Sequence, residues 1–128
     1  MKKGIAVLVI LIVTIAFGFF EIINVKKTLI TLDDLVNDLY IKYETNEDTI
    51  DQFYNETGDI KEFWHNSLIW LCFVFNHRDL STITDSLNRL RAYTKNNDYD
   101  NAICEIELLK DYTSESYHIL GFNLHNIL

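Results

Sequence analysis

Proline is absent from this 128-residue sequence, and glycine occurs only four times, at positions 4, 18, 58 and 121. These two residue types end or kink helices, so their scarcity favours long, uninterrupted helices. No segment shows the alternation of apolar and polar residues that is typical of a half-buried strand. The sequence therefore predicts an all-α protein.

Cysteine is also scarce, with Cys72 and Cys104 as the two examples. Two thiols are too few for the disulfide framework of a small secreted domain. We interpret them as buried free thiols that pack as small apolar residues. A single bridge between them stays open as the alternative, if the fold brings them together outside the cytoplasm.

Basic side chains are outnumbered, with 11 Lys and Arg against 19 Asp and Glu. Four of the basic residues and one of the acidic residues lie within residues 1–27, so the rest of the chain has a net charge of −11. A surface of this charge repels nucleic acid and anionic lipid headgroups. We therefore expect no nucleic-acid partner and no attraction of residues 28–128 to anionic headgroups.

Catalytic motifs are lacking as well. The sequence has no Gly-x-Ser-x-Gly, no Cys-x-x-Cys and no His-x-x-x-His spacing. No serine or cysteine has a base that the sequence makes recognisable. We expect a protein that is not an enzyme and that binds no cofactor.

What the sequence does contain is a long apolar run near its start. Residues 4–20 have no charged side chain and one polar side chain, Thr14. Apolar residues resume at Ile22, so residues 4–25 are long enough to cross the hydrocarbon of a bilayer at about 1.5 Å rise per residue. The run therefore predicts a transmembrane helix.

A cleavable signal peptide is the alternative, with Ala16-Phe17-Gly18 as a passable cleavage site. The apolar run is long for a signal core and continues beyond that site without a helix breaker. We therefore expect an uncleaved signal-anchor over residues 1–27, followed by one domain over residues 28–128.

The basic residues that flank the run decide its orientation only weakly. Lys2 and Lys3 precede the run and Lys26 and Lys27 follow it, which is nearly a tie under the positive-inside rule. A short N-terminal tail normally stays in the cytoplasm when such an anchor inserts. We expect a single-pass protein of the cell membrane whose C-terminal domain is extracytoplasmic.

Apolar residues at three- and four-residue steps continue directly after the anchor, at Leu29, Leu32, Val36, Leu39 and Tyr43. This spacing predicts that the anchor helix runs on into the domain as far as an interruption at residues 45–47. Gly58 is expected to end the next helix. Asp59 and Glu62 are then expected to form a capping box for a helix over residues 60–75.

Three more apolar stripes predict the remaining helices. The stripe of residues 60–75 is the most apolar of the domain and predicts a central core helix. Asp79 and Asp98 are expected to cap the two helices that follow. Short turns make neighbouring helices antiparallel, so we expect an up-and-down bundle of three to four helices. The stripes are Trp64, Leu68, Leu71 and Phe75; Leu80, Ile83, Leu87, Leu90 and Thr94; and Ala102, Ile106, Leu109, Thr113, Tyr117, Leu120, Leu124 and Ile127.

Two Glu-x-x-His motifs, Glu62 with His65 and Glu115 with His118, are the candidates for a metal site. Di-iron bundles combine such a pair with one inward Glu from each of two further helices. The acid that the third helix offers, Asp85, lies about 200° around from the apolar stripe. We therefore expect no metal site.

Two tryptophans and a histidine are the candidates for a partner surface. Trp64 and Trp70 are six residues apart, so they point about 120° from each other on a helix, and one of them is expected in the core. The other is a candidate for an exposed aromatic contact. His77 is expected in a turn near a helix end.

Several short elements in a fixed order resemble a protein family. They are Trp64, Trp70, Asn76-His77-x-Asp79, Leu87-x-x-Leu90-x-x-Tyr93, Asp98-x-x-x-Ala102-x-x-Glu105, Leu109-Lys110 and Asn126-Ile127-Leu128. As an ordered set, they resemble domain of unknown function four-three-six-three, a family of Gram-positive, largely spore-forming bacteria.

The resemblance covers nearly the whole chain, and the sequence departs from the family pattern in having Asp79 where a Glu is usual. It implies a small membrane-anchored helical protein, of a group often found near multi-pass membrane proteins. We therefore expect a non-enzymatic interaction or accessory module that engages the bilayer through its N-terminal helix and a membrane or envelope protein through its domain. A metal-binding or thiol-redox helical bundle is the alternative.

Overall fold

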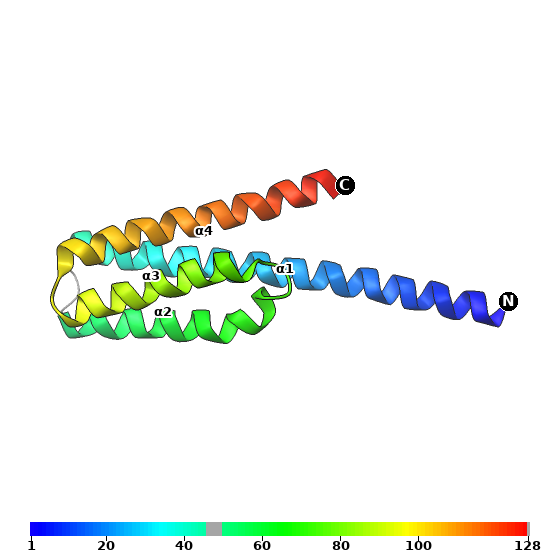
Figure 1. Ribbon diagram of the computed structural model, residues 1–128, viewed down its shortest axis with the longest axis horizontal. Helices are drawn as coiled ribbons and strands as arrows, with labels where there is room; N and C mark the ends of the chain where they lie inside the picture. Colours follow the sequence, from blue (N-terminus) through cyan, green and yellow to red (C-terminus); the bar gives the residue numbers. More distant parts are fainter. Residues whose placement is uncertain (46–49, 128) are drawn as a thin grey trace.

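The computed structural model describes residues 1–45 and 50–127, with side-chain positions for residues 1–45 and 51–116. Within these residues the chain forms four α-helices and no strand (Figure 1). The all-α fold predicted from the sequence, an apolar N-terminal helix followed by a helical bundle, is confirmed. The helices are α1, Lys2–Thr45; α2, Ile50–Leu71; α3, His77–Lys95; and α4, Tyr99–Ile127.

The two halves of α1 lie in different environments. Its N-terminal half projects from the bundle, and its large apolar side chains from Ile5 to Phe20 are exposed (Figure 1). Its C-terminal half buries a stripe that begins at Val25 and ends at Leu39. The predicted continuation of the apolar N-terminal helix into the bundle is therefore confirmed, and α1 is long and apolar enough to cross a membrane.

The bundle is closed by packing between successive helices. Helix α1 packs against α2 and α4, and α3 packs against the same two helices. Apart from Tyr117, Leu120, Leu124 and Ile127, whose side chains lie outside the described residues, the predicted stripes meet in the centre, because apolar residues at this spacing share one face of each helix. The core residues are Val25, Leu29, Leu32, Val36, Leu39, Phe53, Ile60, Trp64, Leu71, Leu80, Ile83, Leu87, Leu90, Ala102, Ile106 and Leu109.

Gly58 does not end a helix, contrary to the prediction. Helix α2 runs through it, and Gly58 lacks the positive φ that glycine supplies at a helix C-terminus. The predicted capping box of Asp59 and Glu62 does not form, because both residues lie inside α2. The guanidinium of Arg91, from α3, lies against Gly58 where a Cβ atom would be, so the glycine makes room for a neighbouring helix.

The cap of α3 also differs from the prediction. Asn76, and not Asp79, is the N-cap: its side chain accepts a hydrogen bond from Arg78 N at 2.9 Å. Asp79 lies in the first turn. The predicted cap of α4 is confirmed, since Asp98 Oδ1 accepts from Asn101 N at 3.3 Å. Between α3 and α4, Asn97 adopts a φ of 58°.

Candidate functional site

A narrow apolar cleft, which we call the wedge, lies between α1 and the end of α2. It encloses about 100 Å³ and lies beside Val25, the first buried residue of α1. The wedge joins the exposed apolar half of α1 to the C-terminal end of α2, and Trp70 is its wall on the α2 side. Its lining residues are Phe17, Phe20, Glu21, Asn24, Val25 and Trp70.

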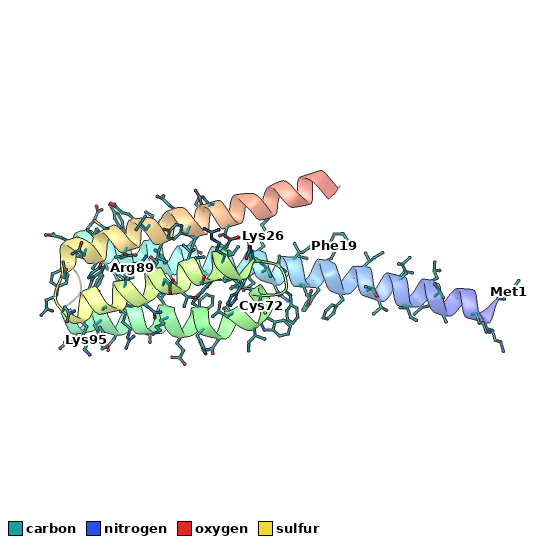
Figure 2. All side chains as sticks on the ribbon, in the orientation of Figure 1. Met1, Phe19, Lys26, Cys72, Arg89 and Lys95 are labelled. Carbon is teal, nitrogen blue, oxygen red and sulfur yellow. The ribbon has the colours of Figure 1, made fainter. Side chains whose placement is uncertain are left out.

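The last three residues of α2 and the three residues that follow form an apolar segment, Ile69–Val74, which we call the apolar turn and which leads towards α3. The exposed fractions of Ile69, Trp70 and Phe73 are 67%, 60% and 71%. Figure 2 places Cys72, in this turn, at the same end of the bundle as Lys26. The apolar turn therefore lies at the end of the bundle from which the projecting part of α1 emerges. We call this part, residues 2–24, the stem.

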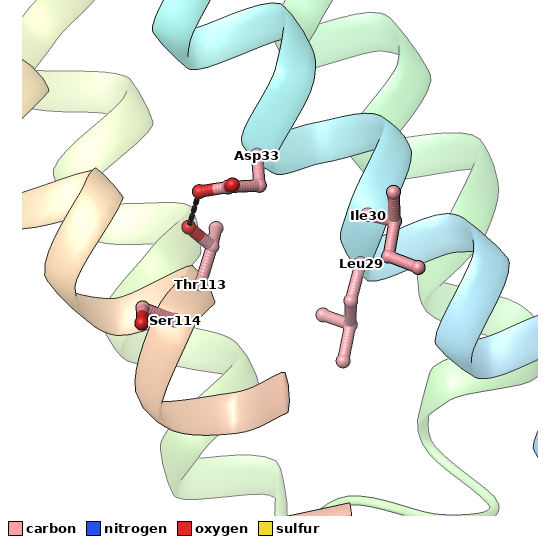
Figure 3. Close-up of a pocket in the computed structure, with 5 residues that line it drawn as sticks. All are labelled: Leu29, Ile30, Asp33, Thr113 and Ser114. Carbon is pink, nitrogen blue, oxygen red and sulfur yellow. Dashed lines mark hydrogen bonds between the residues drawn. The ribbon is translucent and has the colours of Figure 1, made fainter. Parts of the chain in front are cut away.

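A second hollow, of about 140 Å³, lies between α1 and α4 (Figure 3). Leu29 forms an apolar part of its lining, and a hydrogen bond between α1 and α4 lies at its edge. The hydroxyl of Thr113 donates to Asp33 Oδ1 at 2.7 Å. Thr113 is buried, so this bond satisfies a polar group that burial would otherwise penalise, and it connects the two helices.

A third hollow, of about 250 Å³, lies between the start of α3 and α4. Phe75 and Ile83 form its apolar side, and Asp79 and Glu115 line it with carboxylates. Pockets for small organic ligands usually exceed about 300 Å³. All three hollows are smaller than this, so none of them matches the size of a usual small-molecule site.

A buried carboxylate connects α3 to α4. Glu105 is 7% exposed and accepts hydrogen bonds from the Ser86 hydroxyl at 2.6 Å and from Arg89 Nε at 2.7 Å. The bond to Glu105 raises the pKa of Arg89 above its usual value. Each charge in this group has a partner, so its role is to hold two helices in register.

The candidate metal ligands do not converge in the described part of the chain. The side chains of Glu62, His65 and Glu115 are exposed, and that of His118 lies outside the described residues. Among the residues described, no three His, Cys, Asp or Glu side chains form a group that could hold a metal ion.

The two tryptophans have different environments. Trp64 is 1% exposed, and its Nε1–H donates to Thr84 Oγ1 at 2.8 Å. Trp64 is therefore a core residue, which corrects its place in the expected partner surface. Trp70 is exposed, as an aromatic contact requires. His77 is exposed too, but it is the first residue of α3 and not a turn residue, contrary to the prediction. The role of both residues in partner binding stays a prediction.

Both cysteines are free, but both are exposed, so the prediction of buried thiols is wrong. Cys72 lies in the apolar turn. Cys104 lies near the start of α4, at the far end of the bundle, about 20 Å away by the rise of α3. A disulfide needs Cα atoms closer than about 7 Å, so this fold does not allow a bridge within one chain.

The apolar turn was not predicted from the sequence as a feature of its own. A signal for it exists: Asn66 to Asn76 contains no charged side chain, in a chain of which 23% is charged. Exposure distinguishes the turn from a core segment of the same composition. The hydrogen bond between Asp33 and Thr113 had no sequence signal, because 80 residues separate its partners.

Comparison with known proteins adds a family assignment. A family model described as Domain of unknown function (DUF4363) matches residues 19–127. No curated protein and no solved structure matches the chain. The match covers the bundle and the part of α1 that enters it, including the wedge residues from Phe20 onwards.

Proposed function

The chain belongs to the DUF4363 family, and we propose that this member is a single-pass membrane protein that presents a helical interaction module at the outer face of the cell membrane. In this role it catalyses no reaction. The module binds a membrane or envelope protein, and α1 keeps it close to that partner.

One observation carries this proposal: a single helix is exposed and apolar in one half and buried in the bundle core in the other. Apolar side chains cover all sides of the projecting half, which costs free energy in water and is favourable in hydrocarbon. No flexible linker separates this half from the stripe that starts at Val25. The stem therefore fixes the position of the bundle at the membrane surface.

Charge supports a protein partner. Helices α1 and α4 pack against each other, and both carry exposed carboxylates on their outer sides, Asp34 and Asp38 on α1 and Glu107 and Asp111 on α4. An acidic surface of this kind attracts a basic protein surface and repels nucleic acid. We propose these four residues as the centre of the partner surface.

Membrane anchoring is tested by placing charges in the projecting half of α1. The double variant Val9→Arg and Ile12→Arg is expected to move the protein from the carbonate-resistant membrane fraction to the soluble fraction, because arginine is costly in hydrocarbon. Ile41→Arg, at an exposed site in the bundle half, is the matched control and leaves fractionation unchanged. A wild-type protein that carbonate releases from membranes would contradict the proposal.

Orientation is tested with a membrane-impermeant maleimide and the Cys72→Ser variant. Its remaining thiol, Cys104, is exposed at the far end of the bundle. We expect labelling in intact cells. Labelling that requires lysis would place the bundle in the cytoplasm.

The partner is tested by photo-cross-linking from position 111, with position 59 on α2 as the comparison site. We expect position 111 to yield a cross-link to one membrane or envelope protein, and the double variant Asp34→Lys and Asp38→Lys to abolish it. Equal products from both positions, insensitive to charge reversal, would argue against the acidic surface.

A further inference from the structure

We propose that the apolar turn, Ile69–Val74, is a second membrane contact, which rests in the boundary between headgroups and acyl chains of the leaflet from which α1 emerges. This inference depends on the proposed anchoring through α1. It adds a binding site for lipid on a separate part of the fold.

The composition of the turn fits lipid better than water. Four large apolar side chains are exposed within six residues of sequence. They are Ile69, Trp70, Phe73 and Val74. No charged side chain occurs from Asn66 to Asn76. A cluster of large apolar side chains with no charge among them marks an interaction site on a soluble surface.

The depth of the turn fits the same location. A helix that enters about 30 Å of hydrocarbon at Gly4 leaves it about 20 residues later, near Asn24. Trp70 lies against Phe17, Phe20 and Asn24 across the wedge, so its ring is level with this boundary. Tryptophan is enriched at that depth, because its ring is apolar and its N–H finds polar partners there.

The wedge itself supports a lipid occupant. It is continuous with the exposed apolar surface of α1, and four of its lining residues, Phe17, Phe20, Val25 and Trp70, are apolar. The acyl-chain segments next to the headgroups of the surrounding leaflet can fill such a space, whereas water in it would lose hydrogen bonds. The surface of the stem and that of the turn therefore form one apolar boundary.

Charges around the turn fit the headgroup level. Lys27 follows the wedge residue Val25 on α1, and Arg78 follows the uncharged run at the start of α3. Both are exposed, and long basic side chains at this depth can reach lipid phosphates. The bundle as a whole is acidic, which disfavours an attraction to anionic lipid. The contact is therefore hydrophobic, and it should form on zwitterionic membranes.

The native cysteines provide the test, because both are exposed and they lie towards opposite ends of the bundle. Full-length protein is reconstituted into phosphatidylcholine vesicles with a nitroxide on Cys72, in the Cys104→Ser variant, or on Cys104, in the Cys72→Ser variant. Oxygen concentrates in hydrocarbon, and a nickel chelate stays in water. We expect oxygen to relax the Cys72 label more strongly than the chelate does, and the reverse order for Cys104.

A substitution that leaves α1 intact tests the turn more directly. The double variant Trp70→Ser and Phe73→Ser is expected to shift the Cys72 label towards the chelate while the protein still floats with the vesicles. Leu108→Ser, at an exposed apolar site on α4, is the matched control and leaves the label unchanged.

The outcomes separate the two proposals. A protein that floats with the vesicles but has a Cys72 label as accessible to the chelate as the Cys104 label overturns the second contact and leaves the anchor standing. A protein that does not float overturns both.

Discussion

The carboxylate of Glu105, on α4, accepts a hydrogen bond of 2.6 Å from the hydroxyl of Ser86, on α3, and both residues are buried. Arg89 adds an ion pair from the solvent side of the same carboxylate. Since α3 and α4 are held together mainly by apolar contacts, this polar group fixes which residues face each other along the two helices.

Removing that carboxylate should destabilise the bundle. Glu105→Ala leaves the Ser86 hydroxyl buried without its acceptor, while Arg89 can turn to water. We expect the free energy of unfolding to fall by about 1–3 kcal/mol, measured by denaturant titration of the detergent-solubilised protein. Glu105→Gln retains an acceptor and should cost less. An equal loss in both variants would mean that the charge, and not the bond to Ser86, stabilises the pair.

Gly58 and Arg91 should show coupled effects on stability. Alanine at a helix-interior glycine stabilises by about 1 kcal/mol. Gly58→Ala also displaces the Arg91 guanidinium, which lies 4.5 Å from the centroid of the Tyr54 ring in a contact of about 0.5–1 kcal/mol. We expect little net change in the wild-type background and the full gain in an Arg91→Ala background. A double-mutant cycle measures the difference, and additive effects would contradict the contact.

The bundle should lose stability in alkali through Tyr43. Burial, then the charge of Asp100, raise the pKa of Tyr43 above 10.0. Because the folded state favours the neutral phenol, this contribution is complete below the pKa of the unfolded chain and is lost as the pH rises through the folded pKa. The free energy of unfolding should therefore fall more steeply above about pH 10 in wild type than in Tyr43→Phe. Parallel pH profiles would assign the alkaline loss to other groups.

The turn between α3 and α4 should be sensitive to the residue at position 97. Asn97 has a φ of 58°, in the left-handed region that asparagine and glycine tolerate best. We expect Asn97→Ala to lower the free energy of unfolding by about 1 kcal/mol and Asn97→Gly to change it by a few tenths. Thermal unfolding followed by circular dichroism would show the order, and a more stable alanine variant would contradict the assigned strain.

The sequence predicted the helices well because their stripes repeat over many turns. Leu80, Ile83, Leu87 and Leu90 are all buried, and each supports the same helical period. The boundary at Gly58 was wrong because glycine also serves a close approach between helices, and the residue that approaches, Arg91, is 33 positions away. A local rule about helix ends contains no information on that contact.

The candidate sites were harder to predict than the helices. The exposure of Cys104 could have been predicted from the sequence. Cys104 lies two residues from both Ala102 and Ile106, and hence about 200° around the helix from the apolar stripe of α4. For the apolar turn, the lack of charge was visible in the sequence, but its exposure was not, because its residues have the composition of a core segment. Its exposure depends on where α2 ends relative to the stem of α1, and only the assembled helices show that.

The absence of a joint in α1 has a mechanical consequence. Residues 25–45 extend about 30 Å beyond the wedge, so tilting the stem by about 10° sweeps the distal end of the bundle sideways by roughly 5 Å. A helix that spans a bilayer can accommodate a change in its thickness by tilting. In the proposed anchored state, such a change in the lipid would therefore displace the distal end of the bundle.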